Sequence, residues 1–157
     1  MNKFLVELLL FAFGLLMFFG MPYLIRRRLR SGRPSTTLRP IIDDGAGGRE
    51  VPLVATFGGI RGLPWIGFAT NNLNPKLVIG PTGITYRVLR LQTRAFNEVE
   101  QVDIRVFGAT VNLVFMFRDC HSTFEANVGS IILATETLAI LSANVTLSDR
   151  AKRIMVG

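Results

Sequence analysis

The strongest pattern in the chain is an uninterrupted apolar run near its N-terminus. Residues Phe4 to Ile25 carry a single charged side chain, Glu7, among 22 positions. As a helix rising about 1.5 Å per residue, the run would be about 33 Å long, against roughly 30 Å for the hydrocarbon core of a bilayer. The pattern predicts a transmembrane helix to which the rest of the chain is attached.

The charges on either side of this run predict its orientation, because basic residues near a spanning helix favour the cytoplasmic side. Only Lys3 precedes the run, whereas five arginines follow it, and we expect these to contact anionic lipid headgroups. A cleaved signal is disfavoured, since the bulky Met21 and Tyr23 stand where cleavage needs small residues. We therefore expect residues 1–30 to form an uncleaved single-pass anchor in the cell membrane, with the C-terminal domain in the cytoplasm. The five arginines are Arg26, Arg27, Arg28, Arg30 and Arg33.

Residues 31–50 show no apolar period and are rich in proline, serine, threonine and glycine. This composition is typical of a flexible linker, about 25 Å from end to end if it is a random coil. A phosphate-binding loop is not supported, because no Gly-Lys-Ser/Thr follows the glycines at 45, 47 and 48. The sequence thus predicts a folded domain over residues 51–157.

Short apolar runs separated by turn residues follow, and they predict strands. Ile84, Tyr86 and Val88 alternate with Thr85 and Arg87, as expected for a half-buried antiparallel strand. The expected strands are Leu53 to Gly58, Pro64 to Thr70, Lys76 to Ile79, Gly83 to Val88, Leu91 to Phe96, Val102 to Phe107, Val111 to Arg118 and Ser122 to Asn127.

Three of these strands carry more detailed expectations. Val102, Ile104 and Val106 should share a buried face. The stretch from Val111 to Phe117 is apolar on both faces, which predicts a central or helix-covered strand. The turn before Tyr86 contains Gly83, which is able to take the positive φ that other residues resist.

A helix is expected over Ser130 to Ala143, where apolar residues recur at steps of three and four and Ser130 can cap the first turn. Its apolar stripe should cover an open end of the sheet. Residues Ser148 to Met155 form either a further short helix capped by Ser148 or a frayed tail. The stripe comprises Ile131, Ala134, Leu138 and Leu141.

Two segments give the chain a resemblance to a known family. PKLVIGPTGITYRV (75–88) has a Leu-x-Ile strand, a tight turn and an Ile-x-Tyr return strand, and FNEVEQVDIRVF (96–107) enters a strand through an acidic residue followed by isoleucine. With the helix from Ile131, these features resemble the bacterial PH-like (pleckstrin-homology-like) family over residues 53–143. The resemblance implies a mainly antiparallel β barrel closed by a C-terminal α-helix, in a family commonly fused to membrane helices. The expected fold class is therefore one N-terminal transmembrane helix plus such a PH-like barrel.

Charge divides unevenly along the chain. Residues 1–40 hold seven basic and one acidic side chain, whereas residues 41–157 hold eleven and ten. The domain is nearly neutral, which argues against a nucleic-acid partner. The lone Cys120 excludes an internal disulfide.

The best candidate for catalysis is the run from Asp119 to Ser122, which contains an acid, a thiol and an imidazole. In an extended strand Cys120 and His121 point to opposite faces and cannot form a nucleophile and base pair. We interpret the run as a polar turn between two strands. No spacing typical of a metal loop is present, so we expect no catalytic residue, metal site or cofactor.

The function that fits these observations is a membrane-anchored binding or scaffolding module. Arg61 and Trp65 are the expected contacts of a protein partner or of a second copy, because they are an arginine and an aromatic on an expected loop. The alternatives are an enzyme, or enzyme subunit, with an unrecognised site, or a lipid-sensing domain. Lipid recognition is disfavoured because Arg61 is alone where lipid-binding PH domains carry several basic residues.

Overall fold

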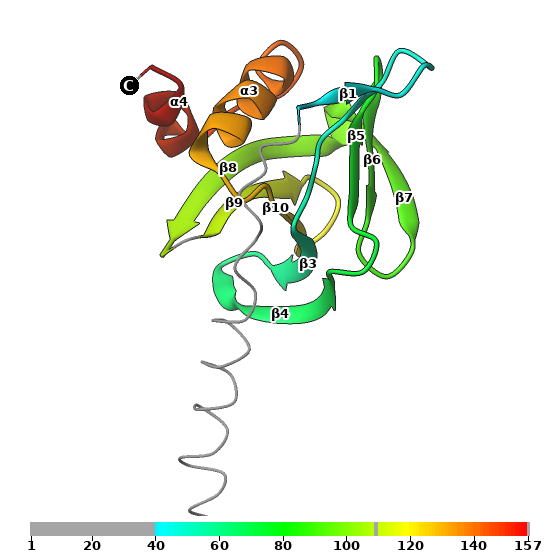
Figure 1. The fold of residues 1–157 in the computed structure, drawn as a ribbon. Coiled ribbons are helices and arrows are strands. Elements are labelled where there is room, and N and C mark those ends of the chain that lie inside the picture. Colours follow the sequence, from blue (N-terminus) through cyan, green and yellow to red (C-terminus); the bar gives the residue numbers. More distant parts are fainter. Residues whose placement is uncertain (1–39, 109, 157) are drawn as a thin grey trace, which may run out of the picture. The chain divides into compact units, whose positions relative to one another are not determined.

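The computed structural model describes residues 40–108 and 110–156, without the side chains of residues 63–68. The described chain forms two antiparallel sheets and two short helices, α3 and α4 (Figure 1). The elements are β1 (Ile42–Asp43), β2 (Arg49–Glu50), β3 (Ala55–Ile60), β4 (Leu63–Asn71), β5 (Lys76–Ile79), β6 (Gly83–Arg87), β7 (Leu91–Ala95), the 3-10 turn η2 (Phe96–Glu98), β8 (Val99–Phe107), β9 (Thr110–Phe117), β10 (Ser122–Asn127), α3 (Ile131–Leu141) and α4 (Asp149–Val156).

Each sheet contains five strands. The first has the order β1-β2-β5-β6-β7 and the second the order β4-β3-β10-β9-β8. β7 leads through η2 directly into β8, so the chain passes from one sheet to the other at that turn. The expected strands β5 and β10 have the predicted bounds, and β9 lies between β8 and β10 as its two apolar faces predicted.

The predicted closed barrel is wrong, because among the described residues the backbone ladder of paired strands does not continue from one sheet into the other. The free edge of β8 is taken by a later segment of the chain: the Val102 amide donates to the Thr146 carbonyl at 2.9 Å, and the Ser148 amide donates to the Val102 carbonyl at 2.9 Å. On the other side, the Asn71 side chain accepts from the Leu73 and Asn74 amides and organises a turn that ends β4 before β5 begins. These local bonds leave two separate sheets.

The transmembrane part of the predicted fold class also needs correction. Within residues 40–108 and 110–156, no helix is long and apolar enough to cross a membrane. The longer of the two described helices, α3, has 11 residues, against about 20 for a span. The segment Phe4 to Ile25, for which the helix was predicted, lies outside the described residues.

Strand alternation was predicted well for β6, where Ile84 and Tyr86 are buried and Thr85 and Arg87 are partly exposed. In β8 the prediction fails at the end of the strand, since Val106 is 54% exposed. Gly83 does not have a positive φ. It is required for another reason, because a Cβ atom there would lie 2.2 Å from the Arg94 carbonyl oxygen on β7.

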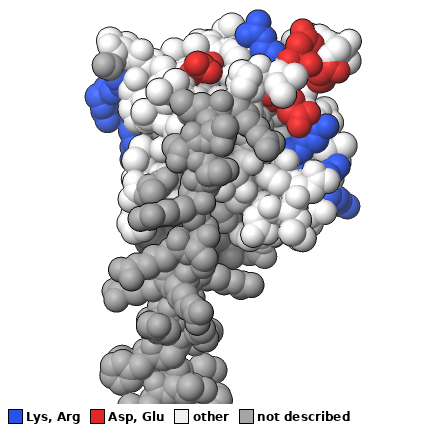
Figure 2. All heavy atoms as spheres, viewed as in Figure 1, with Lys and Arg blue, Asp and Glu red and all other residues white. Residues whose placement is uncertain are grey.

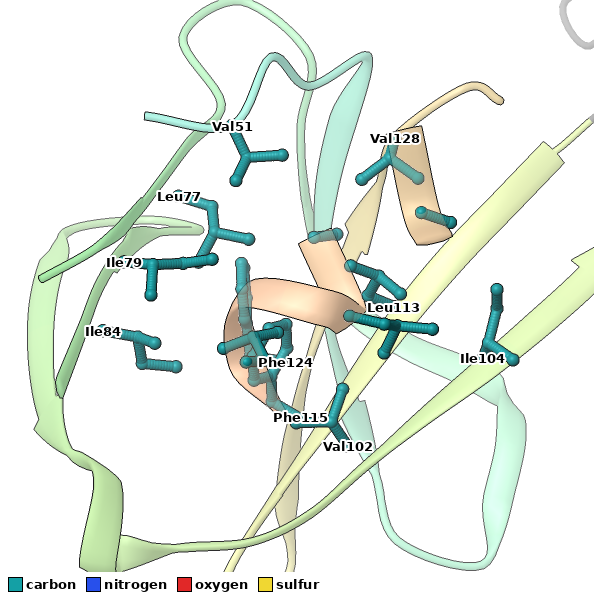
Figure 3. Close-up of a cluster of buried hydrophobic side chains, with 14 of the residues drawn as sticks. Val51, Leu77, Ile79, Ile84, Val102, Ile104, Leu113, Phe115, Phe124 and Val128 are labelled. Carbon is teal, nitrogen blue, oxygen red and sulfur yellow. The ribbon is translucent and has the colours of Figure 1, made fainter. Parts of the chain in front are cut away.

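Aromatic and aliphatic side chains fill the space between the two sheets (Figure 3). Phe124 of β10 is at the centre of this core, with its ring 4.2 Å from that of Tyr86 and 5.3 Å from that of Phe115. Tyr86 belongs to the first sheet and Phe115 to the second, so Phe124 links the two sheets.

Helix α3 covers the core as predicted, and the Ser130 hydroxyl caps it by accepting from the Leu133 amide at 3.2 Å. The buried stripe differs from the predicted one, because Ile131 is 44% exposed and Thr137 is buried instead. The Thr137 hydroxyl donates to the Leu133 carbonyl within the helix. This hydrogen bond offsets the free-energy cost of burying the polar hydroxyl. Ser148 caps α4, so the C-terminal segment is a helix.

Truncating the central ring should destabilise the fold strongly. We expect Phe124→Ala to lower the free energy of unfolding by about 3–5 kcal/mol, because it removes the contact between the sheets and leaves a cavity. Urea denaturation of the full chain measures the loss. Leu73→Ala, at a position that is 95% exposed, is the control and should change stability by less than about 0.5 kcal/mol. Equal midpoints for the two variants would contradict the central role of Phe124.

Candidate functional site

The described surface carries an open groove of about 490 Å³ between the β1-β2 hairpin and helix α3. The hairpin and α3 lie in the upper part of Figure 1. The groove has an apolar floor and charged side chains at its rim. Its lining residues are Ile41, Asp43 and Arg49 from the hairpin, and Glu136, Ala139 and Ile140 from α3.

The hairpin side of the groove is formed by residues that were expected to be a flexible linker. Asp44 organises the hairpin turn, since its Oδ1 atom accepts from the Ala46 and Gly48 amides at 2.9 and 2.7 Å. Gly45 and Gly47 have φ angles of 76° and 81°, which other residues rarely adopt. The run of aspartates and glycines thus forms a structured turn.

The hairpin is fixed to the body of the domain through β2, which pairs with β5. Glu50 of β2 also forms an ion pair with Lys76 of β5, at 3.6 Å. Just after β2, the Val51 amide donates to the Leu77 carbonyl at 2.9 Å, and the Val51 side chain is buried in the core. The hairpin wall of the groove is therefore attached to the sheet by backbone hydrogen bonds.

The helix side of the groove is unusually apolar for a surface helix. The sequence of α3, IILATETLAIL, has hydrophobic residues around its whole circumference. A helix of this kind is normally buried on all sides. Here one face covers the core, while Ile132 is 57% exposed on the face that carries Glu136, Ala139 and Ile140. The outward face is thus an exposed apolar surface beside the groove.

Asp43 and Glu136 place carboxylates on opposite sides of the groove, with Arg49 near Asp43 on the hairpin. None of the ion pairs between described residues involves these three side chains. With the exposed Asp44 of the same hairpin, the rim has an excess of negative charge. Figure 2 shows acidic side chains gathered at one end of the drawn face.

The Asp119 to Ser122 run forms the bend between β9 and β10. Asp119 Oδ2 accepts from Arg94 Nη1 at 2.6 Å, and Cys120 Sγ lies 3.0 Å from Ser122 Oγ. The His121 side chain is exposed, and no hydrogen bond between described residues joins its imidazole to Cys120 or Asp119. The bend therefore does not align a nucleophile with a base.

Arg94 connects β7 to this bend and so joins the two sheets at one end. Its Nη1 atom lies 3.1 Å from Glu98 Oε1, and its guanidinium is 5.3 Å from the centre of the Phe117 ring. The hydrogen bond to Asp119 raises the pKa of Arg94 above its usual value and holds the pKa of Asp119 below its usual value. We interpret this network as a structural contact, because the guanidinium is held by two carboxylates and an aromatic ring of the domain itself.

Of the two residues predicted to contact a partner, Arg61 lies in the turn between β3 and β4. Its Nη2 atom donates to Glu100 Oε1 of β8, and this hydrogen bond lowers the pKa of the Glu100 carboxyl. Trp65 lies on β4 rather than in a loop, and its side chain is outside the described part of the chain. The predicted membrane-contact arginines, Arg26, Arg27, Arg28, Arg30 and Arg33, lie outside the described residues as well.

The sequence analysis missed the groove entirely. A signal was present at both walls: the Asp43 to Gly48 run matches a short hairpin turn, and α3 is apolar on its outer face. Among the residues described, no group of three or more His, Cys, Asp or Glu side chains is arranged to hold a metal ion.

Comparisons of the chain with protein-family models, with curated proteins and with solved structures gave no match. The resemblance to the bacterial PH-like family stays a prediction.

The Arg94 network predicts a dependence of stability on pH. Because the pKa of Asp119 is lower in the folded protein than in the unfolded chain, its stabilising effect is complete above its ordinary pKa and is lost as the pH falls through the lowered value. We expect Arg94→Gln to lower stability at pH 7 and the difference from the wild type to shrink below about pH 4. Thermal unfolding between pH 7 and pH 3 measures this.

The matched control is Arg153→Gln, at an exposed position of α4 that should alter stability little at any pH. A difference between Arg94→Gln and the wild type that stayed constant down to pH 3 would show that Arg94 acts by packing on Phe117 alone.

Proposed function

We propose that this chain is a protein-binding module that works at the cytoplasmic face of the cell membrane, with the hairpin and helix groove as its binding surface. The observation that carries the proposal is the exposed apolar face of α3 beside the groove. Contiguous apolar surface is uncommon on folded domains and, where it is extensive, marks interaction sites.

The filled interior of the domain supports a binding role over an enzymatic one. The side chains between the sheets, among them Phe115, Phe124 and Leu113, are fully buried and occupy the space that a deep substrate pocket needs (Figure 3). The groove itself carries aliphatic residues, two carboxylates and an arginine. This composition suits recognition of another chain.

The proposed location is supported by the sequence. The apolar run from Phe4 to Ile25 favours a lipid environment, and the arginines that follow it favour the anionic cytoplasmic leaflet. Confinement to a membrane surface raises the local concentration of the module, so that a partner with weak intrinsic affinity is still captured. A second copy of the chain at the same surface is an equally accessible partner.

The binding surface can be tested by site-specific photo-crosslinking in living cells. A photoreactive phenylalanine analogue at Ala139, in the groove, should give one or a few discrete protein adducts. The same analogue at Arg153 should give none, because this exposed residue lies on α4 and does not line the groove. Mass spectrometry then separates adducts with a second copy from adducts with another protein. Similar adduct patterns at the two positions, or none at Ala139, would overturn the proposed surface.

Location is tested by fractionating cells that express the full chain or a chain lacking residues 4–25. We expect the full chain to sediment with membranes and to resist extraction by alkaline carbonate, because an apolar run of this length binds lipid strongly. The shortened chain should remain in the supernatant. Recovery of the full chain in the supernatant would contradict a membrane location.

A further inference from the structure

We infer that the hairpin and helix groove binds an extended segment of a partner protein in which an aliphatic side chain stands next to lysine or arginine. This inference rests on the proposed binding function and names the chemistry of the occupant. It follows from the apolar floor of the groove, the charge of its rim and the strand edge beside it.

The floor of the groove selects an aliphatic side chain. Ala139 and Ile140 of α3 line the groove together with Ile41 of the hairpin, and the exposed Ile132 lies about two helical turns before Ala139 on the same helix. A volume of 490 Å³ is within the range of about 300–1,000 Å³ that is usual for ligand sites. Because the floor lacks a deep enclosure, a side chain carried on a longer backbone fits it better than an isolated small molecule.

The rim selects positive charge. Glu136 on the helix and Asp43 on the hairpin flank the apolar floor, Asp44 follows in the same turn, and Arg49 is the one basic residue among the described lining residues. No described ion pair neutralises Glu136 or Asp43. A cation beside the bound aliphatic residue would therefore be attracted to Glu136 and less strongly to Asp43, which lies opposite Arg49 in the hairpin, whereas an acidic segment would be repelled by Glu136.

The backbone of the occupant is extended because one wall of the groove is a sheet edge. The two-residue strand β1 pairs only with β2 among the described strands, so no other described strand occupies its outer side. Open edges accept an added strand, whose backbone hydrogen bonds supply affinity while alternate side chains supply specificity. Because successive side chains of a strand point to opposite faces, every second side chain of the bound segment would point towards the apolar floor and α3.

The test uses the full chain in detergent and an array of eight-residue peptides with randomised sequence. We expect the bound peptides to be enriched in isoleucine, leucine or valine beside lysine or arginine. Ala139→Arg should abolish binding of the enriched peptides, because it places a long cationic side chain in the groove. No enrichment, or enrichment of acidic peptides, overturns the inference.

The contribution of charge is measured with a matched pair of variants. Glu136→Gln and Asp149→Asn each remove one carboxylate from an exposed helix position, but only Glu136 lines the groove. We expect Glu136→Gln to weaken binding of an enriched peptide about fivefold, the effect of about 1 kcal/mol, and Asp149→Asn to change it less than twofold. Equal effects of the two substitutions would overturn the role assigned to the rim.

Two further outcomes distinguish a partner segment from the chain's own basic segment, and the binding function from the chemistry inferred for the occupant. Peptide binding that emerges only when Arg26, Arg27 and Arg28 are replaced by glutamine would place the chain's own basic segment in the groove and overturn the assignment to a partner. If crosslinking at Ala139 succeeds while the array shows no basic preference, the binding function stands and the chemistry inferred for the occupant is wrong. Failure of crosslinking at Ala139 counts against the binding function itself.

Discussion

Aromatic packing between the two sheets is the contact on which the rest of this structure depends. Phe124 lies between Tyr86 of the first sheet and Phe115 of its own sheet, and all three rings are almost completely buried. Two open sheets have little stability unless their apolar faces are covered. The rings cover these faces towards one another, and α3 covers the core with Leu133, Leu138 and Leu141.

This arrangement leaves strand edges, which a closed barrel would not have. The edge of β8 is occupied by the segment from Thr146 to Ser148, which reaches it because α3 ends in a turn and α4 begins at Asp149. β1 has no corresponding cover among the described residues. Among the described residues, the surface proposed for binding therefore lies beside a strand edge that no later segment of the chain covers.

Helix α3 covers the core with one face and exposes the other, and these two environments favour different side chains. Its inner face must be apolar to cover the core, which Leu138 and Leu141 achieve with no exposed area. Its outer face would be polar in a helix that serves only the core, yet Ile132, Ala139 and Ile140 are apolar. Ile140 is partly buried against the core, whereas Ile132 and Ala139 are exposed, so core packing does not explain these two residues and a binding surface would.

Local pattern determined strands β3 to β10, the helix near residue 131 and its serine cap, because alternation, apolar spacing and capping act over a few neighbouring residues. It also predicted that β9 would be central. Only the tertiary structure decided that the sheets stay separate, that residues 42–50 join the first sheet, and that Asp43 faces Glu136 across a groove. These features depend on pairings between residues far apart in the chain, such as Arg49 with Ile79 and Val102 with Leu147. The pattern of apolar and polar residues within one strand does not predict which distant strand it will pair with.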